Sequence, residues 1–171
     1  MKLREKIKNL YPYQKNLLRA GCVLLALFLV YNLGWAIWLE VRYGDFKKAV
    51  GYSEEYQSWE TQKDGWLFTV FPARYLRFNG NLSTANEQGE GLIIWPQPAG
   101  GYKYAAIFYT GTIMTDMGPS DSYITIAMDE NCNWTDEGNA GYGDAEKALL
   151  RERKADVEVW LAAANEVLDL S

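Results

Sequence analysis

The sequence predicts an α+β protein: one N-terminal transmembrane helix, then a small extracytoplasmic domain of antiparallel β-sheet packed against a C-terminal amphipathic helix. Three observations predict it. Residues 20–39 contain no Asp, Glu, Lys or Arg; residues 65–128 alternate β-rich runs with turn residues; and residues 144–170 repeat apolar side chains at helical spacing. The chain accordingly divides into a cytoplasmic basic N-terminus (1–19), a transmembrane helix (20–39), a juxtamembrane linker (40–64) and an extracytoplasmic α+β domain (65–171).

The uncharged segment has the length of a membrane span. At about 1.5 Å of rise per residue, twenty helical residues cover about 30 Å, the thickness of a bilayer's hydrocarbon core. We expect the helix to begin near Gln14, after Pro12, and to end at about Tyr43, before Gly44 and Asp45. A cleaved signal peptide has a shorter apolar core of roughly 7–15 residues, so an uncleaved anchor is the prediction.

The charges on either side of the span predict its orientation. Residues 1–19 carry six Lys and Arg and one Glu, whereas residues 40–171 carry eleven Lys and Arg and twenty-one Asp and Glu, which gives net charges of +5 and −10. Short basic flanks stay on the cytoplasmic side of a membrane. The N-terminus is therefore expected inside the cell and the acidic domain outside the cytoplasm, at the cell membrane.

Polar and aromatic residues near the span suggest specific contacts. Trp35, Trp38 and Tyr43 fall where amphipathic rings prefer to lie, at the membrane interface. Asn32 is the one strongly polar side chain within the span. Its amide either bonds to another transmembrane helix or reaches the outer headgroups.

Short β-rich runs separated by turn residues predict a sheet of four to six antiparallel strands. The clearest is Tyr123–Met128, in which Ile124, Ile126 and Met128 lie on one face. Asn79-Gly80 favours a tight hairpin turn, and residues 83–91 are expected to form a loop. The other expected strands are Trp66–Phe71, Arg74–Phe78, Leu92–Trp95 and Tyr102–Thr110.

The last segment, residues 144–170, is expected to be one helix that covers one face of the sheet. Asp144 is the expected N-cap, because its carboxylate can accept hydrogen bonds from the first-turn amides. The apolar stripe consists of Val157, Trp160, Leu161, Ala164 and Leu168, and the opposite face carries Arg151, Lys154, Asp156, Glu158 and Asn165.

Composition excludes several classes of chemistry. The chain has no His, so no Ser-His-Asp or Cys-His mechanism and no His-ligated zinc site can be built from it. Acidity argues against nucleic acid as a partner. Cys22 lies in the span and Cys132 outside it, so the two cannot pair; Cys132 is either free or bonded to another chain. No cofactor motif is present.

One segment partly matches a calcium-binding loop. Asp129, Asn131 and Asn133 supply oxygen atoms at the first three side-chain positions of such a loop. The match ends at Trp134, where a Gly is needed, and at Ala140, where a bidentate Glu is needed. The alternative is a polar turn after a strand, since Asp and Asn bond readily to nearby backbone.

These observations favour a non-enzymatic module tethered to the membrane of a bacterial cell envelope, which binds or positions something there. Its expected partners are the lipid bilayer and another membrane or envelope protein. One alternative is a glycan-cleaving enzyme that uses two carboxylates, drawn from loop residues Asp116, Asp121, Asp129, Glu130, Asp136 and Glu137. Another is a subunit of a pilus-like or secretion assembly. The layout resembles that of pilins, with Gly21 able to end a leader, although Ala26 stands where pilins carry Glu.

Overall fold

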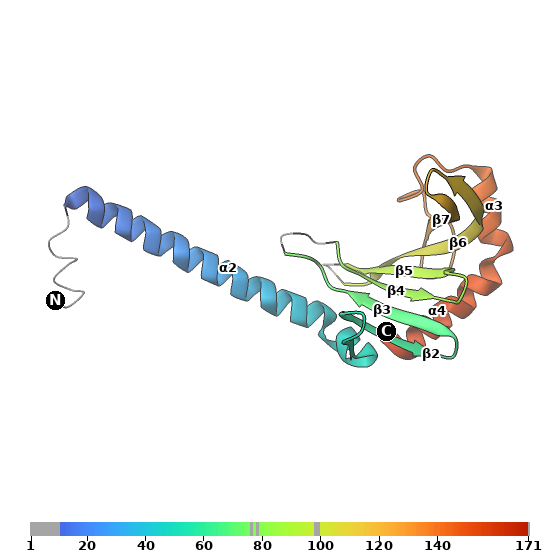
Figure 1. Cartoon of the computed structure of the whole chain (residues 1–171), viewed down its shortest axis with the longest axis horizontal. Helices are drawn as coiled ribbons and strands as arrows, with labels where there is room; N and C mark the ends of the chain where they lie inside the picture. The colour runs from blue at the N-terminus through green and yellow to red at the C-terminus, as the bar shows by residue number, and fades with distance from the viewer. Residues whose placement is uncertain (1–10, 76, 78, 98–99, 171) are drawn as a thin grey trace. The chain divides into compact units, whose positions relative to one another are not determined.

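A computed structural model describes residues 11–75, 77, 79–97 and 100–170 (Figure 1). The protein is α+β, and the chain divides into two compact units, Met1–Val41 and Arg42–Ser171. We call Arg42–Ser171 the folded domain. Its elements and the preceding helix are α2 (Pro12–Val50), β1 (Tyr52–Ser53), β2 (Ser58–Lys63), β3 (Trp66–Phe71), β4 (Asn81–Ala85), β5 (Gly91–Pro96), β6 (Tyr102–Thr115), β7 (Gly118–Met128), α3 (Asp144–Glu152) and α4 (Lys154–Leu168).

Helix α2 is long enough and apolar enough to cross a membrane. Its most apolar 18-residue stretch has a mean hydropathy of 2.1. The helix does not end before Gly44, as the sequence suggested, but at Val50. Tyr43 and Val50 are buried, which ties the last two turns to the folded domain. The helix ends at Gly51, whose φ of +76° is left-handed and whose N–H donates to the Lys47 carbonyl at 3.0 Å.

The sheet has seven antiparallel strands in the order β1 to β7, each paired with its neighbour in the chain. The sequence predicted fewer, because β1 and β2 lie in the segment expected to be a linker and β4 overlaps the start of the expected loop 83–91. The residues of 74–78 that the structure describes form no strand, and 76 and 78 lie outside the described residues. Asn79-Gly80 belongs to the connection between β3 and β4 and is not a two-residue hairpin turn.

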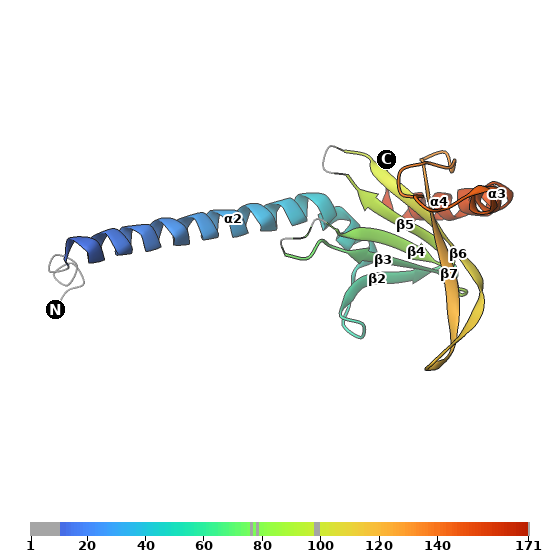
Figure 2. The same ribbon diagram turned by 90° about the horizontal axis from the view of Figure 1, so that it is seen from above.

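Strand alternation places one face of the sheet against α4 (Figure 2). Trp160 of α4 lies against this face, with its ring centroid 6.4 Å from that of Trp66 on β3 and 5.5 Å from that of Phe108 on β6. The core between the two layers consists of Phe68, Val70, Leu82, Leu92, Ile94, Phe108, Ile126, Leu150, Val157, Trp160, Ala164 and Leu168, all of which are buried.

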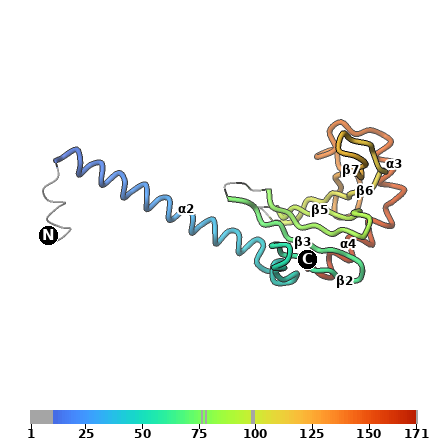
Figure 3. Tube along the Cα trace, viewed as in Figure 1, coloured from blue at the N-terminus to red at the C-terminus, as the bar shows by residue number. Residues whose placement is uncertain are grey.

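The C-terminal segment is two successive helices and not one (Figure 3). The helix begins after Gly143, whose N–H donates to the Glu146 carboxylate at 2.7 Å, so Asp144 is the first helical residue and not the N-cap. Arg153 separates α3 from α4. The predicted apolar stripe is confirmed, with Val157, Trp160, Ala164 and Leu168 buried.

An ion-pair network forms at this break. The guanidinium of Arg153 donates to both carboxylate oxygens of Glu90, at 3.2 and 3.0 Å, and also to Asp156 at 2.5 Å. Glu90, which precedes β5, also accepts a hydrogen bond from the N–H of Tyr109 at 3.1 Å. Tyr109 lies in β6, beyond the last residue of β6 that pairs with β5. The hydrogen bonds that Arg153 donates to Glu90 and Asp156 hold the pKa of Arg153 above its ordinary value. One carboxylate therefore joins the helix break to the sheet.

Asn139 covers the outer edge of β7. Its side-chain amide accepts the N–H of Ala127 and donates to the carbonyl of the same residue, both at 2.8 Å, and donates to the Thr135 carbonyl at 2.7 Å. The side chain thus takes the place of a neighbouring strand at this position. Asn139 is buried, so all three bonds are shielded from water.

Candidate functional site

The connection between β7 and α3 folds back on itself at its first turn. The Asp129 carboxylate accepts the backbone N–H groups of Asn131 and Asn133, at 2.9 and 2.8 Å. Cys132, with a φ of +58°, makes the reversal, and its side chain is buried. This turn brings Asn133 and Trp134 toward the helices that follow.

Helix α3 and the start of α4 supply basic side chains to the same region. Lys147, Arg151 and Lys154 follow one another at intervals of four and three residues. Residues at this spacing share one side of a helix. The helices therefore present three cations toward the turn, while Leu150 is directed into the core.

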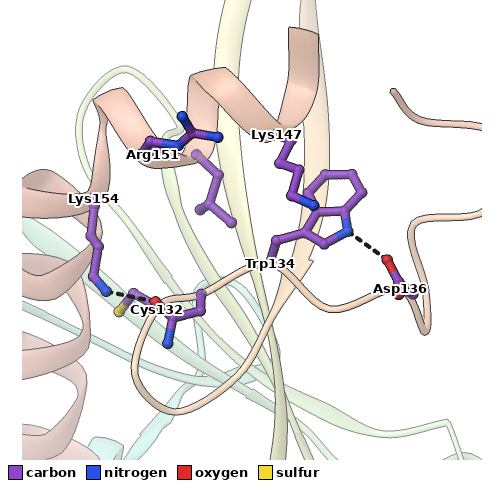
Figure 4. Close-up of a pocket in the computed structure, with 8 residues that line it drawn as sticks. Cys132, Trp134, Asp136, Lys147, Arg151 and Lys154 are labelled. Carbon is purple, nitrogen blue, oxygen red and sulfur yellow. Dashed lines mark hydrogen bonds between the residues drawn. The ribbon is translucent and has the colours of Figure 1, made fainter. Parts of the chain in front are cut away.

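Together these segments enclose a pocket of about 370 Å³, which we call the α3 pocket (Figure 4). The Nζ of Lys147 lies 5.8 Å from the ring centroid of Trp134. The indole N–H of Trp134 donates to the Asp136 carboxylate at 3.0 Å. The pocket is lined by Cys132, Asn133, Trp134, Asp136, Lys147, Leu150, Arg151 and Lys154.

The lining of the pocket has the opposite charge to the domain. Residues 42–171 carry eleven Lys and Arg against twenty Asp and Glu, a net charge of −9. The pocket lining carries three cations against one carboxylate, Asp136, a net charge of +2. Lys154 also lines an adjoining pocket that contains Glu130 and Glu158. A cleft lined mainly by one sign of charge concentrates ions of the other sign, so this arrangement suits an anion.

The basic residues of the pocket differ in their partners from several other cations of the domain. Elsewhere in the domain Lys63 pairs with Glu166, Lys103 with Glu137, and Arg153 with Glu90 and Asp156. Among the residues that the structure describes, Lys147, Arg151 and Lys154 form no ion pair. Lys154 donates instead to the neutral side chain of Asn133, at 2.8 Å.

The structure places the predicted calcium ligands in one turn. Asp129 Oδ2 accepts the side-chain amide of Asn133 at 3.3 Å, and Asn133 Oδ1 accepts Lys154, so these oxygens are used within the protein. Burial alone would raise the pKa of Asp129, but hydrogen bonds from Asn133 and Asn131 and the charge of Lys154 together lower it. No group of three or more His, Cys, Asp or Glu within the described residues could hold a metal ion. Calcium binding stays a prediction.

Cys132 is 2% exposed and forms no disulfide, and burial raises the pKa of its thiol. A buried, protonated thiol is a poor nucleophile and is out of reach of a second chain. Of the two alternatives left by the sequence, the structure therefore favours the free thiol over an intermolecular bond.

The six loop acids considered for glycan cleavage do not all lie together, although three of them border one pocket. Asp129, Glu130 and Glu137 border a second pocket of about 470 Å³, together with Trp95 and other side chains of β6 and β7. Glu137 pairs there with Lys103, and Asp136 binds the Trp134 indole. Asp121 accepts the hydroxyl of Thr112 on the β6–β7 hairpin. A general acid needs a raised pKa, whereas that of Asp129 is lowered.

The residues named for membrane contacts are found on α2. The side-chain amide of Asn32 donates to the Phe28 carbonyl of its own helix at 2.6 Å, and the rings of Trp35 and Trp38 lie 5.0 Å apart. Tyr43 is 1% exposed, and a Cβ added at Gly80 would lie 2.5 Å from its hydroxyl. Tyr43 therefore packs inside the folded domain, where the sequence suggested a membrane-interface position.

Sequence reasoning did not identify the basic residues of the α3 pocket as a site. It assigned Arg151 and Lys154 to the solvent face of the helix. The signal that could have identified them is the helical spacing of Lys147, Arg151 and Lys154 in a domain with a large negative net charge. No protein-family model, curated protein or solved structure shows significant similarity to this chain.

Proposed function

We propose that the protein is a membrane-tethered extracytoplasmic module whose folded domain binds or positions a component of the cell envelope. The observation that carries the proposal is α2, in which Leu24, Leu25, Phe28 and Leu29 each expose more than half of their side-chain surface. Only 6% of its most apolar 18-residue stretch is buried. A core helix of a soluble domain would be largely buried, and exposed apolar surface costs about 25 cal/mol per Å² in water.

Charge asymmetry supports the orientation. The six basic residues before the span favour a cytoplasmic N-terminus, which places the folded domain on the other side of the membrane. A pocket of opposite charge to its domain supports a binding role, because such a pocket offers a ligand a distinct chemical environment.

The first experiment tests the anchor. Full-length protein should stay in the membrane fraction after washing at high salt, and protease added to spheroplasts should degrade the folded domain. Replacing Leu25 and Phe28 by Lys puts two charges in the span, each costing about 2.5–3.5 kcal/mol at the helix centre, and should release the protein from the membrane. The matched control is Val159→Lys on α4, where the side chain is 61% exposed and the change should leave the protein in the membrane.

Four outcomes contradict the proposal. Release of the full-length chain into buffer without detergent would exclude an anchor, and protection of the folded domain from external protease would reverse the orientation. A mature chain that lacks the whole span would identify a signal sequence. Loss of residues 1–21 alone would support the pilus-like alternative, in which Gly21 ends a leader.

A further inference from the structure

We propose that the α3 pocket binds a phosphate monoester, either on a soluble phosphorylated molecule or in a lipid headgroup. This proposal names a ligand class for the proposed function, and it rests on that function for the location of the pocket in the cell envelope. The inference starts from charge: in a domain with twenty Asp and Glu, the three cations of the pocket form no ion pair among the described residues. Cations that are gathered in one pocket and form no ion pair are available to a ligand.

The geometry favours phosphate over a smaller anion. A phosphate monoester carries a charge of about −1.5 to −2 and three terminal oxygens, so several separate cations can share it. Arg151 can donate two parallel hydrogen bonds to a phosphate, and Lys147 and Lys154 act as point charges on either side of it in the helix sequence. A carboxylate has one charge and two oxygens, and leaves part of this donor set unused.

The remaining lining fits the part of the ligand that carries the phosphate. A pocket of about 370 Å³ has room for a phosphate and for some of the attached group. Trp134 offers apolar surface, whereas Leu150 lines the pocket but is only 2% exposed. Asp136 is the one carboxylate in the lining, and its bond to the Trp134 indole fixes the indole's orientation. Binding of an anion beside this bond changes the environment of the indole N–H, which provides a reporter.

The test uses the full chain in an uncharged detergent, with its seven Trp residues labelled with ¹⁵N. Trp134→Phe identifies the indole resonance of Trp134. Sodium phosphate is then titrated against sodium chloride and sodium acetate at equal ionic strength. We expect phosphate to move the Trp134 resonance in a saturable manner, with smaller, non-saturating changes from chloride and acetate. The other six indole resonances should stay in place.

A matched pair of variants locates the binding. Arg151→Gln removes an exposed guanidinium that has no hydrogen bond or ion pair among the described residues, so the fold should be unaffected. It should weaken phosphate binding about tenfold, as expected for the loss of a charge-assisted bidentate contact. Arg74→Gln removes the same charge from an exposed position that does not line the pocket, and should leave the affinity unchanged.

Reconstitution in bilayer discs distinguishes the two sources of phosphate. If discs containing phosphatidic acid, whose headgroup is a phosphate monoester, bring the Trp134 resonance to its phosphate-saturated position with no phosphate added, the ligand is a lipid headgroup. If phosphate still moves it there, the ligand is soluble. Equal responses to phosphate, acetate and chloride, or equal affinities for the Arg151→Gln and Arg74→Gln variants, would overturn the proposal. Because binding is measured in detergent, its failure is distinct from failure of the membrane anchor.

Discussion

Replacing Glu90 by Gln removes one negative charge from the point where the α3–α4 break meets the sheet. The Glu90 side chain is 11% exposed and that of Arg153 is 33% exposed, so the pair is mostly shielded from water. The carboxylate accepts three hydrogen bonds, two from Arg153 and one from the Tyr109 N–H. A glutamine side chain has one acceptor oxygen and cannot accept all three.

The expected loss of stability is about 2–3 kcal/mol. Breaking a fully buried ion pair by removing one partner costs about 3–5 kcal/mol, because a charge is left buried. Arg153 is a third exposed and keeps its bond to Asp156, so water and that carboxylate offset part of the cost. A single hydrogen bond to a charged group contributes about 1.5–3 kcal/mol, which agrees with the reduced figure.

Urea unfolding of the full chain in an uncharged detergent, followed by near-ultraviolet circular dichroism, measures the change in the folded domain. With a denaturant slope of about 1–3 kcal/mol per molar, the midpoint should fall by roughly 0.7–3 M. Glu87→Gln is the matched control, since Glu87 is exposed in the same turn and should change stability by less than about 0.5 kcal/mol. Equal midpoints for the two variants would refute this account of the network.

Three further changes test other parts of the fold. Asn139→Ala removes three buried hydrogen bonds and should cost about 2–3 kcal/mol, with faster hydrogen exchange at the Ala127 amide; unchanged exchange there would contradict the edge-covering role. Gly91→Ala would place a Cβ 1.9 Å from the Thr84 carbonyl oxygen, so we expect the free energy of unfolding to fall by several kcal/mol. A thermal midpoint equal to that of the wild type would disprove the close approach of these two backbone segments. Asp129 has a lowered pKa, so its contribution is present above its unfolded pKa of about 3.9 and is lost as the pH falls through the folded value. Unfolding should therefore be measured at pH 7 and pH 3 for the wild type and Asp129→Asn. We expect the variant to be less stable at pH 7 by about 1 kcal/mol or less, and the difference to shrink at pH 3. A difference that is the same at both pH values would show that the charge of Asp129 is not what stabilises the turn.

The sequence could predict the elements whose apolar pattern is regular. Tyr123–Met128 alternates cleanly, and Ile126 and Met128 are buried as that pattern requires. The same holds for the apolar stripe of α4. In both cases burial on one face decides the structure, and periodicity reports burial directly.

Elements with polar or mixed sequences were missed because their order comes from their neighbours. Strand β4, Asn-Leu-Ser-Thr-Ala, has the composition of a loop, yet Leu82 and Thr84 are buried between β3 and β5. Gly44 is compatible with a helix end, but burial of Tyr43 and Val50 holds the helix beyond it. A Gly in a helix interior costs about 1 kcal/mol relative to Ala. Burial of Tyr43 and Val50 stabilises the helix by more than this cost.

The candidate site was out of reach for a related reason. Basic side chains at helical spacing are common on solvated surfaces, and nothing in the sequence says that the Asp129–Trp134 turn lies against them. The break at Arg153 has no Gly or Pro to mark it either. It coincides with a contact to Glu90, which lies 63 residues earlier in the chain.

The hairpin of β6 and β7 continues beyond the support of the rest of the sheet. Strand β5 pairs with β6 only as far as Ile107, so the residues from Phe108 to Thr115 have β7 as their one neighbouring strand. Met117 at its tip is 99% exposed. Two-stranded ribbons are marginally stable in water, so the outer part of this hairpin can separate and re-form while the seven-stranded core stays intact. Limited digestion of the native domain should then begin at this projection, and the fragments should remain associated through the core that they share.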